Sequence, residues 1–211
     1  DILKLVTKMA EVSLNSPVEI EFAVTLGDET PMPAYFGFLQ VRPMVKPENN
    51  AQILIDKINR EDMFILSDMA LGNGKYHVSY ILYIKPKEFN SSLTRTIASE
   101  ISVMNKKGIL SRMAKENNSY MLIGPGRWGT TDPWLGIPVD FSDIAGACVI
   151  VETQIPGMEV EPSQGTHFFQ NMTSFKIAYL TVKSYGENNF IDWEWLESQE
   201  IVYETKYIKL I

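Results

Sequence analysis

The sequence predicts an α+β protein in two parts. Its first residues combine a helical run of apolar side chains with two alternating, strand-like runs, and helices and strands mix through the remainder. A polar stretch with a proline, residues 46–50, separates residues 1–46 from residues 47–211. Apolar residues make up 45% of the 211, enough for a substantial core. We therefore expect a helix plus β-hairpin, followed by a mixed-sheet α/β domain.

Composition narrows the classes of protein to consider. A formal net charge of −7 argues against a broad surface for nucleic acid or anionic membrane, but a local phosphate site needs only a few N–H groups and a cation. No run of 18 apolar residues and no signal segment is present, and a single cysteine cannot form an internal disulfide. We expect a cytoplasmic protein. Because the chain starts at Asp1 within a helical pattern, we also expect it to be part of a longer one.

The first part of the chain reads as one helix and two strands. Apolar residues recur at helical spacing through residues 2–12, and Pro17 stops that pattern. Residues 18–26 then alternate between apolar and polar, and residues 34–44 form a second strand after a turn at residues 27–33. The two strands are close enough in sequence to pair as a hairpin.

Four polar side chains should share one face of this hairpin, because they lie two residues apart within each strand. They are Glu19, Glu21, Gln40 and Arg42. Carboxylates beside an amide oxygen suit Mg²⁺, which prefers oxygen ligands, and a nearby arginine can neutralise charge on a transferring phosphoryl group. The alternative is a solvated strand face with an incidental Glu/Arg pair.

These strands also carry a resemblance to a known family. Residues 16–23 read Ser-Pro-Val-Glu-Ile-Glu-Phe-Ala, and residues 38–43 read Phe-Leu-Gln-Val-Arg-Pro. Together with the preceding helix they resemble the end of the ATP-grasp nucleotide-binding domain of phosphoenolpyruvate synthase and pyruvate phosphate dikinase.

The resemblance implies an incomplete ATP-grasp tail over residues 1–46, whose remainder would lie upstream. It implies that Glu21 and Gln40 are metal and nucleotide ligands. It also places Glu19 and Arg42 at the phosphate site, with Arg42 steadying the phosphates, although the family more often has Asp where Glu19 stands.

In the second part, a glycine-rich loop follows a short buried strand at residues 120–123. The loop contains Gly124, Gly126, Arg127 and Gly129. Glycines after a strand let backbone N–H groups approach a ligand closely, and the arginine adds a positive charge, so the loop is a candidate anion cradle. Its spacing is neither that of a P-loop nor that of a dinucleotide-binding fingerprint. A tight structural turn packed by tryptophans is the alternative.

A second candidate segment spans residues 161–171, where proline, serine and glycine lead into a short helix. His167 should lie near the N-terminus of that helix, where N–H groups attract anions and the helix dipole favours neutral imidazole. We expect Arg127 and His167 to converge on one anion site, with His167 as hydrogen-bond donor or phosphoryl acceptor. A packed helix start is the alternative.

Residues 118–182 resemble the terminal region of proteins commonly labelled phosphoenolpyruvate synthase-like. Neither the phosphohistidine motif nor the pyruvate-binding barrel of true synthases is recognisable here. This second resemblance implies no particular activity for residues 47–211. The ATP-grasp resemblance of residues 1–46 implies that the longer protein transfers phosphoryl groups with ATP and Mg²⁺ as a kinase or dikinase, while this fragment alone is inactive. The alternative is a non-catalytic module that binds a small anionic metabolite or docks onto other domains of the same chain.

Overall fold

The structure, a computed structural model, divides into two compact units, Asp1–Lys46 (unit 1) and Pro47–Ile211 (unit 2). It describes residues 2–14, 16–25, 35–43, 58–72, 74–110, 119–156, 158–163 and 166–211, without the side chains of His167 and Thr173. Helices and mixed sheets place the protein in the α+β class.

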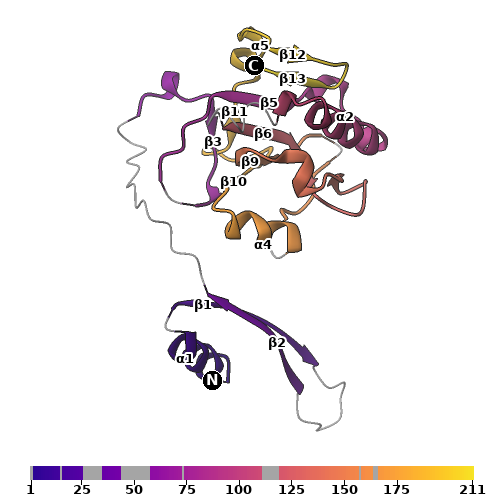
Figure 1. Ribbon diagram of the computed structural model, residues 1–211. Helices are drawn as coiled ribbons and strands as arrows, with labels where there is room; N and C mark the ends of the chain where they lie inside the picture. The colour runs from indigo at the N-terminus through magenta and orange to yellow at the C-terminus, as the bar shows by residue number, and fades with distance from the viewer. Residues whose placement is uncertain are drawn as a thin grey trace. The chain divides into compact units, whose positions relative to one another are not determined.

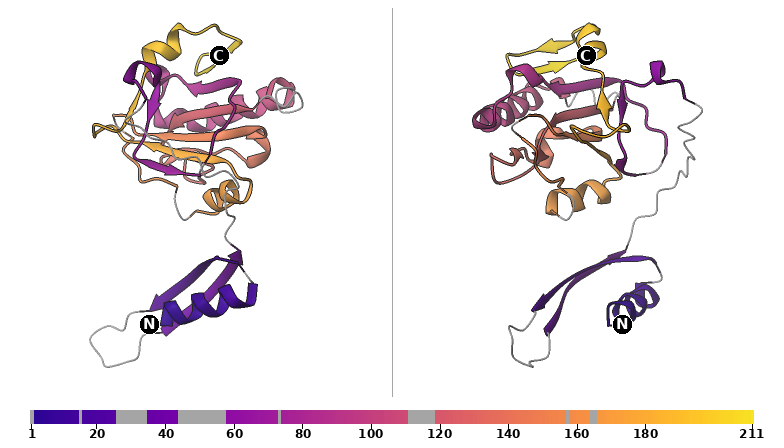
Figure 2. Two further views of the ribbon diagram at one scale, coloured as in Figure 1. Left: turned by 90° about the vertical axis from the view of Figure 1, so that its left-hand side faces the viewer. Right: turned by 180° about the vertical axis from the view of Figure 1, so that it is seen from behind.

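Unit 1 contains one helix and one hairpin, as the sequence pattern predicts. Helix α1 (Ile2–Leu14) precedes strands β1 (Val18–Thr25) and β2 (Tyr35–Pro43), which pair antiparallel. The register shifts between Glu21 and Phe22, where β2 carries one extra residue. Figure 2 shows α1 along one face of the twisted hairpin. The predicted turn at residues 27–33 lies outside the described residues.

The outer side of α1 is apolar but uncovered. None of the helix residues is buried, and Leu5, Met9 and Val12 are 61%, 62% and 72% exposed. These three positions recur at helical spacing, so they form one stripe. A two-stranded hairpin with one helix buries too little apolar surface to be stable by itself. The exposed apolar stripe of unit 1 is therefore the kind of surface that packs against further protein.

Unit 2 is built on a seven-stranded mixed sheet. In spatial order its strands are β12 (Tyr203–Glu204), β13 (Ile208–Leu210), β5 (Tyr80–Ile84), β6 (Tyr120–Pro125), β9 (Ala147–Thr153), β10 (Ala178–Val182) and β4 (Met69–Leu71). The four central strands β5, β6, β9 and β10 are parallel and follow one another in chain order, as Figure 1 shows. The carboxyl ends of these four strands therefore meet at one edge of the sheet.

Helices and short segments cover both faces of this sheet. The helices are α2 (Thr94–Lys106), α4 (His167–Ser174) and α5 (Trp193–Ser198). Short 3-10 turns are η2 (Arg60–Asp62), η3 (Pro86–Glu88), η4 (Ser91–Leu93) and η5 (Phe141–Ile144). Two small pairings are β3 (Ile65–Leu66) with β11 (Phe190–Ile191), and β7 (Arg127–Trp128) with β8 (Gly136–Ile137).

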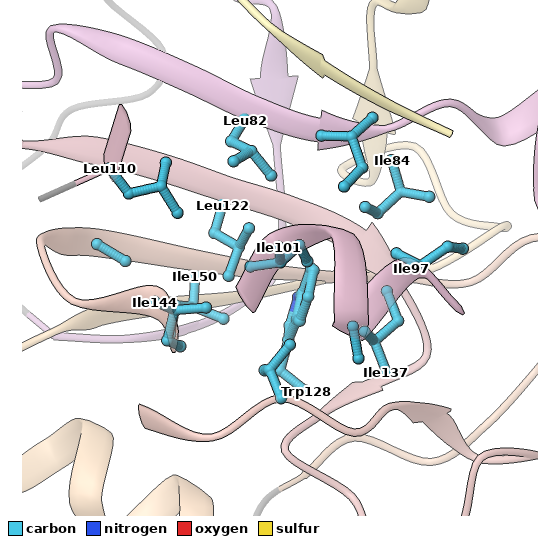
Figure 3. Packing of buried hydrophobic residues seen from close by; sticks show 14 of the residues in the cluster. Leu82, Ile84, Ile97, Ile101, Leu110, Leu122, Trp128, Ile137, Ile144 and Ile150 are labelled. Atoms are coloured by element: carbon cyan, nitrogen blue, oxygen red, sulfur yellow. The ribbon is translucent and has the colours of Figure 1, made fainter. Parts of the chain in front are cut away.

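Alternate residues of the central strands enter two separate apolar clusters, because successive side chains point to opposite faces. Cluster 1 joins strand residues such as Leu122 and Ile150 to Ile101 of α2 and Met172 of α4. Cluster 2 joins Ile123 and its neighbours on the opposite face to α5 and to the β3–β11 pair. Figure 3 shows cluster 1 with the Trp128 side chain inside it.

Helix α2 buries one apolar stripe of side chains and ends near a glycine. Ile97, Ile101 and Met104 form its buried stripe, and the helix ends at Lys106, two residues before Gly108, whose φ is +77°. Gly108 tolerates that backbone conformation because it has no Cβ. The apolar stripe of residues 92–116 predicts one long helical segment with a kink or break at Gly108. The break is confirmed, while residues 111–118 lie outside the described residues.

Three further elements expected in unit 2 differ from the structure or fall on residues that it does not describe. The apolar pattern of residues 76–84 predicts a strand over that range, but the strand begins only at Tyr80, and no pattern in the sequence predicts β4. The single strand expected over residues 201–210 is instead the β12–β13 hairpin, because the Thr205 hydroxyl accepts hydrogen bonds from the N–H groups of Tyr207 and Ile208 and turns the chain. The helix expected over residues 51–59 lies almost wholly outside the described residues.

A hydrogen-bonded group that includes an ion pair stabilises the sheet at β13. Lys209, 5% exposed, donates to Glu197 Oε2 at 2.6 Å, and the Tyr83 hydroxyl donates to Glu197 Oε1 at 3.0 Å. The hydrogen bond from Lys209 lowers the pKa of Glu197. Because this pKa is lower in the folded state, the stabilisation is complete above the ordinary value of 4.5 and is lost as the pH falls through the lowered value.

Replacing Glu197 by glutamine should therefore remove about 1 kcal/mol of stability at neutral pH, a modest loss because half of this side chain is exposed and solvent screens the pair. The loss should shrink as the pH falls below 4.5. Thermal denaturation between pH 7 and pH 3 measures both effects. Glu194→Gln in the same helix, at an exposed position, is the control. Equal effects of the two variants would count against the Lys209 pair.

Candidate functional site

The hairpin of unit 1 brings the four predicted polar residues together. Glu19 pairs with Arg42 and Glu21 pairs with Gln40 across β1 and β2. Residues directly opposite each other in an antiparallel pair point to the same face, so the four side chains form one patch. The Arg42 Nη2 donates to Gln40 Oε1 at 3.2 Å. Glu19, Glu21 and Gln40 are exposed, and Arg42 is half-buried.

The donor set of this patch suits a hard cation. Two carboxylates and one amide oxygen are the kinds of ligand that Mg²⁺ binds, usually together with water and substrate phosphates. The amide oxygen of Gln40 still has a second lone pair beside its bond from Arg42. Among the described residues, no three His, Cys, Asp or Glu side chains gather as a complete metal cage. A metal held here would therefore share its coordination with a ligand.

The glycine loop of unit 2 is filled by protein side chains. A Cβ on Gly124 would lie 2.3 Å from the Trp128 ring, and one on Gly129 would lie 1.8 Å from the Phe168 ring. At Gly126 the nearest atom would be the Leu135 carbonyl oxygen, 2.6 Å away. At all three glycines, neighbouring protein atoms thus occupy the space that a Cβ would need. This arrangement has the character of the tryptophan-packed turn.

Arg127 is the cation of this loop and lies beside the second predicted segment. Its Nε donates to the Glu161 carbonyl oxygen at 2.7 Å, and within the residues that the structure describes its terminal nitrogens have no acceptor. Gly129 packs on Phe168, the second residue of α4. The two segments therefore converge. The side chain of His167 lies outside the described residues, as do Gln164 and Gly165, whereas the His167 backbone begins α4.

A buried carboxylate joins these two segments. Glu152, at 3% exposure, lies in β9. Its Oε1 accepts hydrogen bonds from the backbone N–H of Trp128 at 3.0 Å and from the Ser163 hydroxyl. Its Oε2 accepts hydrogen bonds from the backbone N–H of Ser163 at 3.0 Å and from the Tyr179 hydroxyl at 2.6 Å. A buried carboxylate is tolerated only when donors satisfy it, and here both oxygens are satisfied.

The apolar pattern of residues 147–152 predicts a buried strand, but it does not single out Glu152 as a functional residue. The signal was present, since a carboxylate at the end of an apolar strand needs partners when it is buried. Its partner Tyr179 stays protonated, because burial, and next the neighbouring Glu152 charge, raise the pKa of that hydroxyl well above its ordinary range. The Glu152 group therefore holds the loop and the segment before α4 in place.

Comparison of the chain with protein-family models, curated proteins and solved structures found no match. Within the part of the chain that the structure describes, no helix is both long enough and apolar enough to cross a membrane.

Proposed function

We propose that the chain belongs to an ATP-dependent phosphotransferase similar to phosphoenolpyruvate synthase, and that unit 1 contributes its last metal and phosphate ligands. The observation that carries this proposal is the β1–β2 register, which pairs Glu19 with Arg42 and Glu21 with Gln40 on one face. A solvated strand face requires no such combination of carboxylates, amide and arginine.

Each residue has a specific role in this proposal. Glu21 and Gln40 hold Mg²⁺ through their side-chain oxygens, and Glu19 lies beside them in the phosphate site. Arg42 contacts the phosphates with its guanidinium, which presents several donors in a fixed plane. The metal, when bound, neutralises charge on the phosphates. The exposed apolar stripe of α1 supports packing of unit 1 against further protein, as an ATP-grasp domain completed by upstream residues would supply.

Substitution in the longer protein tests this proposal. Glu21→Ala and Arg42→Ala should each reduce ATP hydrolysis at least tenfold, because an arginine or metal ligand at a transferring phosphoryl group contributes about that much or more. Calorimetric titration with Mg²⁺ and ATP should show weaker binding in both variants.

The matched control is Glu11→Gln, which changes a partly exposed carboxylate of α1 instead of one on the β1–β2 hairpin. It should leave ATP binding and hydrolysis unchanged. Unaltered binding and hydrolysis in both Glu21→Ala and Arg42→Ala would exclude the proposed role of the hairpin.

A second candidate concerns unit 2, which could bind an anionic metabolite without changing it or dock onto other domains. The convergence of Arg127 with the segment before α4 favours this candidate, because among the described residues only the Nε of the Arg127 guanidinium has an acceptor there. Calorimetry of the chain with phosphate, pyruvate, phosphoenolpyruvate and adenine nucleotides distinguishes these roles. Binding that Arg127→Gln abolishes supports the anion site, and the absence of binding to all of them supports docking.

A further inference from the structure

Unpaired polar atoms gather at the carboxyl end of β9 and β10. Five buried side-chain atoms of the described residues have no hydrogen-bond partner, and three of them belong to Thr153, Gln154 and Asn189. The remaining two belong to Asn105 and Tyr120. Buried polar atoms are nearly always paired, so a local group of exceptions marks a place where a ligand, an ion or a water can bind.

Two of these atoms are hydrogen-bond donors on the same face of the sheet, whereas the third, Gln154 Oε1, is an acceptor, and Gln154 follows Thr153 directly and so points to the other face. Thr153, 4% exposed, ends β9, and by strand alternation it shares a face with Val149 and Val151 of cluster 2. Asn189, 9% exposed, directly precedes β11, whose Ile191 packs on that same cluster. The hydroxyl of Thr153 and the amide nitrogen of Asn189 are the unpaired atoms.

Lys183 links these two residues. It directly follows Val182, which is the register partner of Thr153, and its backbone N–H donates to Asn189 Oδ1 at 3.4 Å. Thr153 thus lies opposite Val182, and the Asn189 side chain is bonded to the next residue along the chain, Lys183. On the other side of Thr153, the Gly126 N–H donates to the Thr153 carbonyl oxygen.

The position and charge of this group suit an anion. Ligands of open sheets with parallel strands bind at the carboxyl ends of those strands. The Lys183 ammonium is 3.8 Å from Asp68 Oδ1, the outer limit of an ion pair, and both side chains are partly exposed. Such a pair is weak and leaves donors of Lys183 for another acceptor. Residues 184–188 that follow are exposed, so solvent reaches this end of the sheet.

We infer that this edge is a binding site for an oxyanion, a phosphate or a carboxylate group, which accepts hydrogen bonds from the Thr153 hydroxyl, the Asn189 amide and the Lys183 ammonium. All three groups are donors, which matches a ligand that offers only acceptors. The site involves neither the hairpin patch nor Arg127. Substitutions of Thr153 and Lys183 therefore test this site separately from both functions proposed above.

Calorimetric titration of the 211-residue chain with inorganic phosphate, and separately with acetate, tests the inference and identifies the preferred class of anion. Thr153→Val and Lys183→Met should each weaken the preferred anion about tenfold or more, the usual effect of removing a hydrogen bond to a charged group. Thr153→Ser keeps the hydroxyl and should retain binding. Without anion, Thr153→Val should raise the melting temperature, because a methyl group replaces a hydroxyl that has no partner.

Matched controls are Thr96→Val and Lys106→Met, at exposed positions of α2. Both should bind the anion as the unaltered chain does. Lack of saturable binding of either anion would overturn the inference, and so would undiminished binding in Thr153→Val and Lys183→Met. Should Thr153→Val fail to fold, the comparison of Lys183→Met with Lys106→Met decides the question.

Discussion

Replacing Glu152 by glutamine should lower the free energy of unfolding of unit 2 by about 3 kcal/mol. Each carboxylate oxygen receives one backbone N–H, from Trp128 at Oε1 and from Ser163 at Oε2. Whichever oxygen becomes the amide nitrogen, a backbone donor then faces a second donor. Rotating the glutamine amide cannot relieve this conflict, and the site is too buried for water to do so.

Urea denaturation followed by tryptophan fluorescence measures this loss, because all four tryptophans lie in unit 2. Glu159→Gln is the matched control, since Glu159 is an exposed carboxylate seven positions along the chain. Its expected change lies within about 0.5 kcal/mol. A loss below about 1 kcal/mol for Glu152→Gln would mean that the carboxylate does not join the two segments as described.

Replacing Gly129 by alanine should destabilise unit 2 by about 2–5 kcal/mol, the sum of two effects. A φ of +68° is unfavourable for a residue with a Cβ, at about 1–2 kcal/mol. The new methyl group would also lie 1.8 Å from the ring of Phe168, which is itself packed on Phe141 with ring centroids 4.3 Å apart. Such overpacking adds about 1–3 kcal/mol.

Gly72→Ala separates the two effects. Gly72 also has a positive φ, +103°, but a Cβ there would meet its nearest neighbours at an ordinary 3.4 Å. The same fluorescence-detected denaturation should show a smaller loss for Gly72→Ala than for Gly129→Ala. Equal losses would show that the contact with Phe168 contributes nothing.

Elements set by local patterns could be predicted from the sequence. The apolar stripe of α1, the alternation of β1 and the break at Gly108 depend on neighbours a few residues away, and the structure contains them. The turn between β12 and β13 could not be predicted, because it depends on how the Thr205 hydroxyl is used once the chain has folded. Very short strands such as β4 carry too few residues for a periodic signal.

For the candidate sites too, features set by local pattern could be predicted, and features set by tertiary packing could not. The shared face of Glu21 and Gln40 follows from strand alternation and hairpin pairing, and the register has them opposite each other. What occupies the space around the glycines of the loop was not predictable, because Trp128 and Phe168 reach that space only through tertiary packing. The unpaired hydroxyl of Thr153 is likewise visible only when the atoms around it are known.

The pairing of β13 with β5 has a consequence for synthesis of the chain. The strands β5, β6, β9 and β10 are added in the order in which a ribosome makes them, each beside its predecessor. The other edge of β5 stays open until residues 208–210 emerge and pair with it. Nascent chains stopped before that point would expose an apolar strand edge, the kind of surface on which aggregation begins and to which chaperones bind.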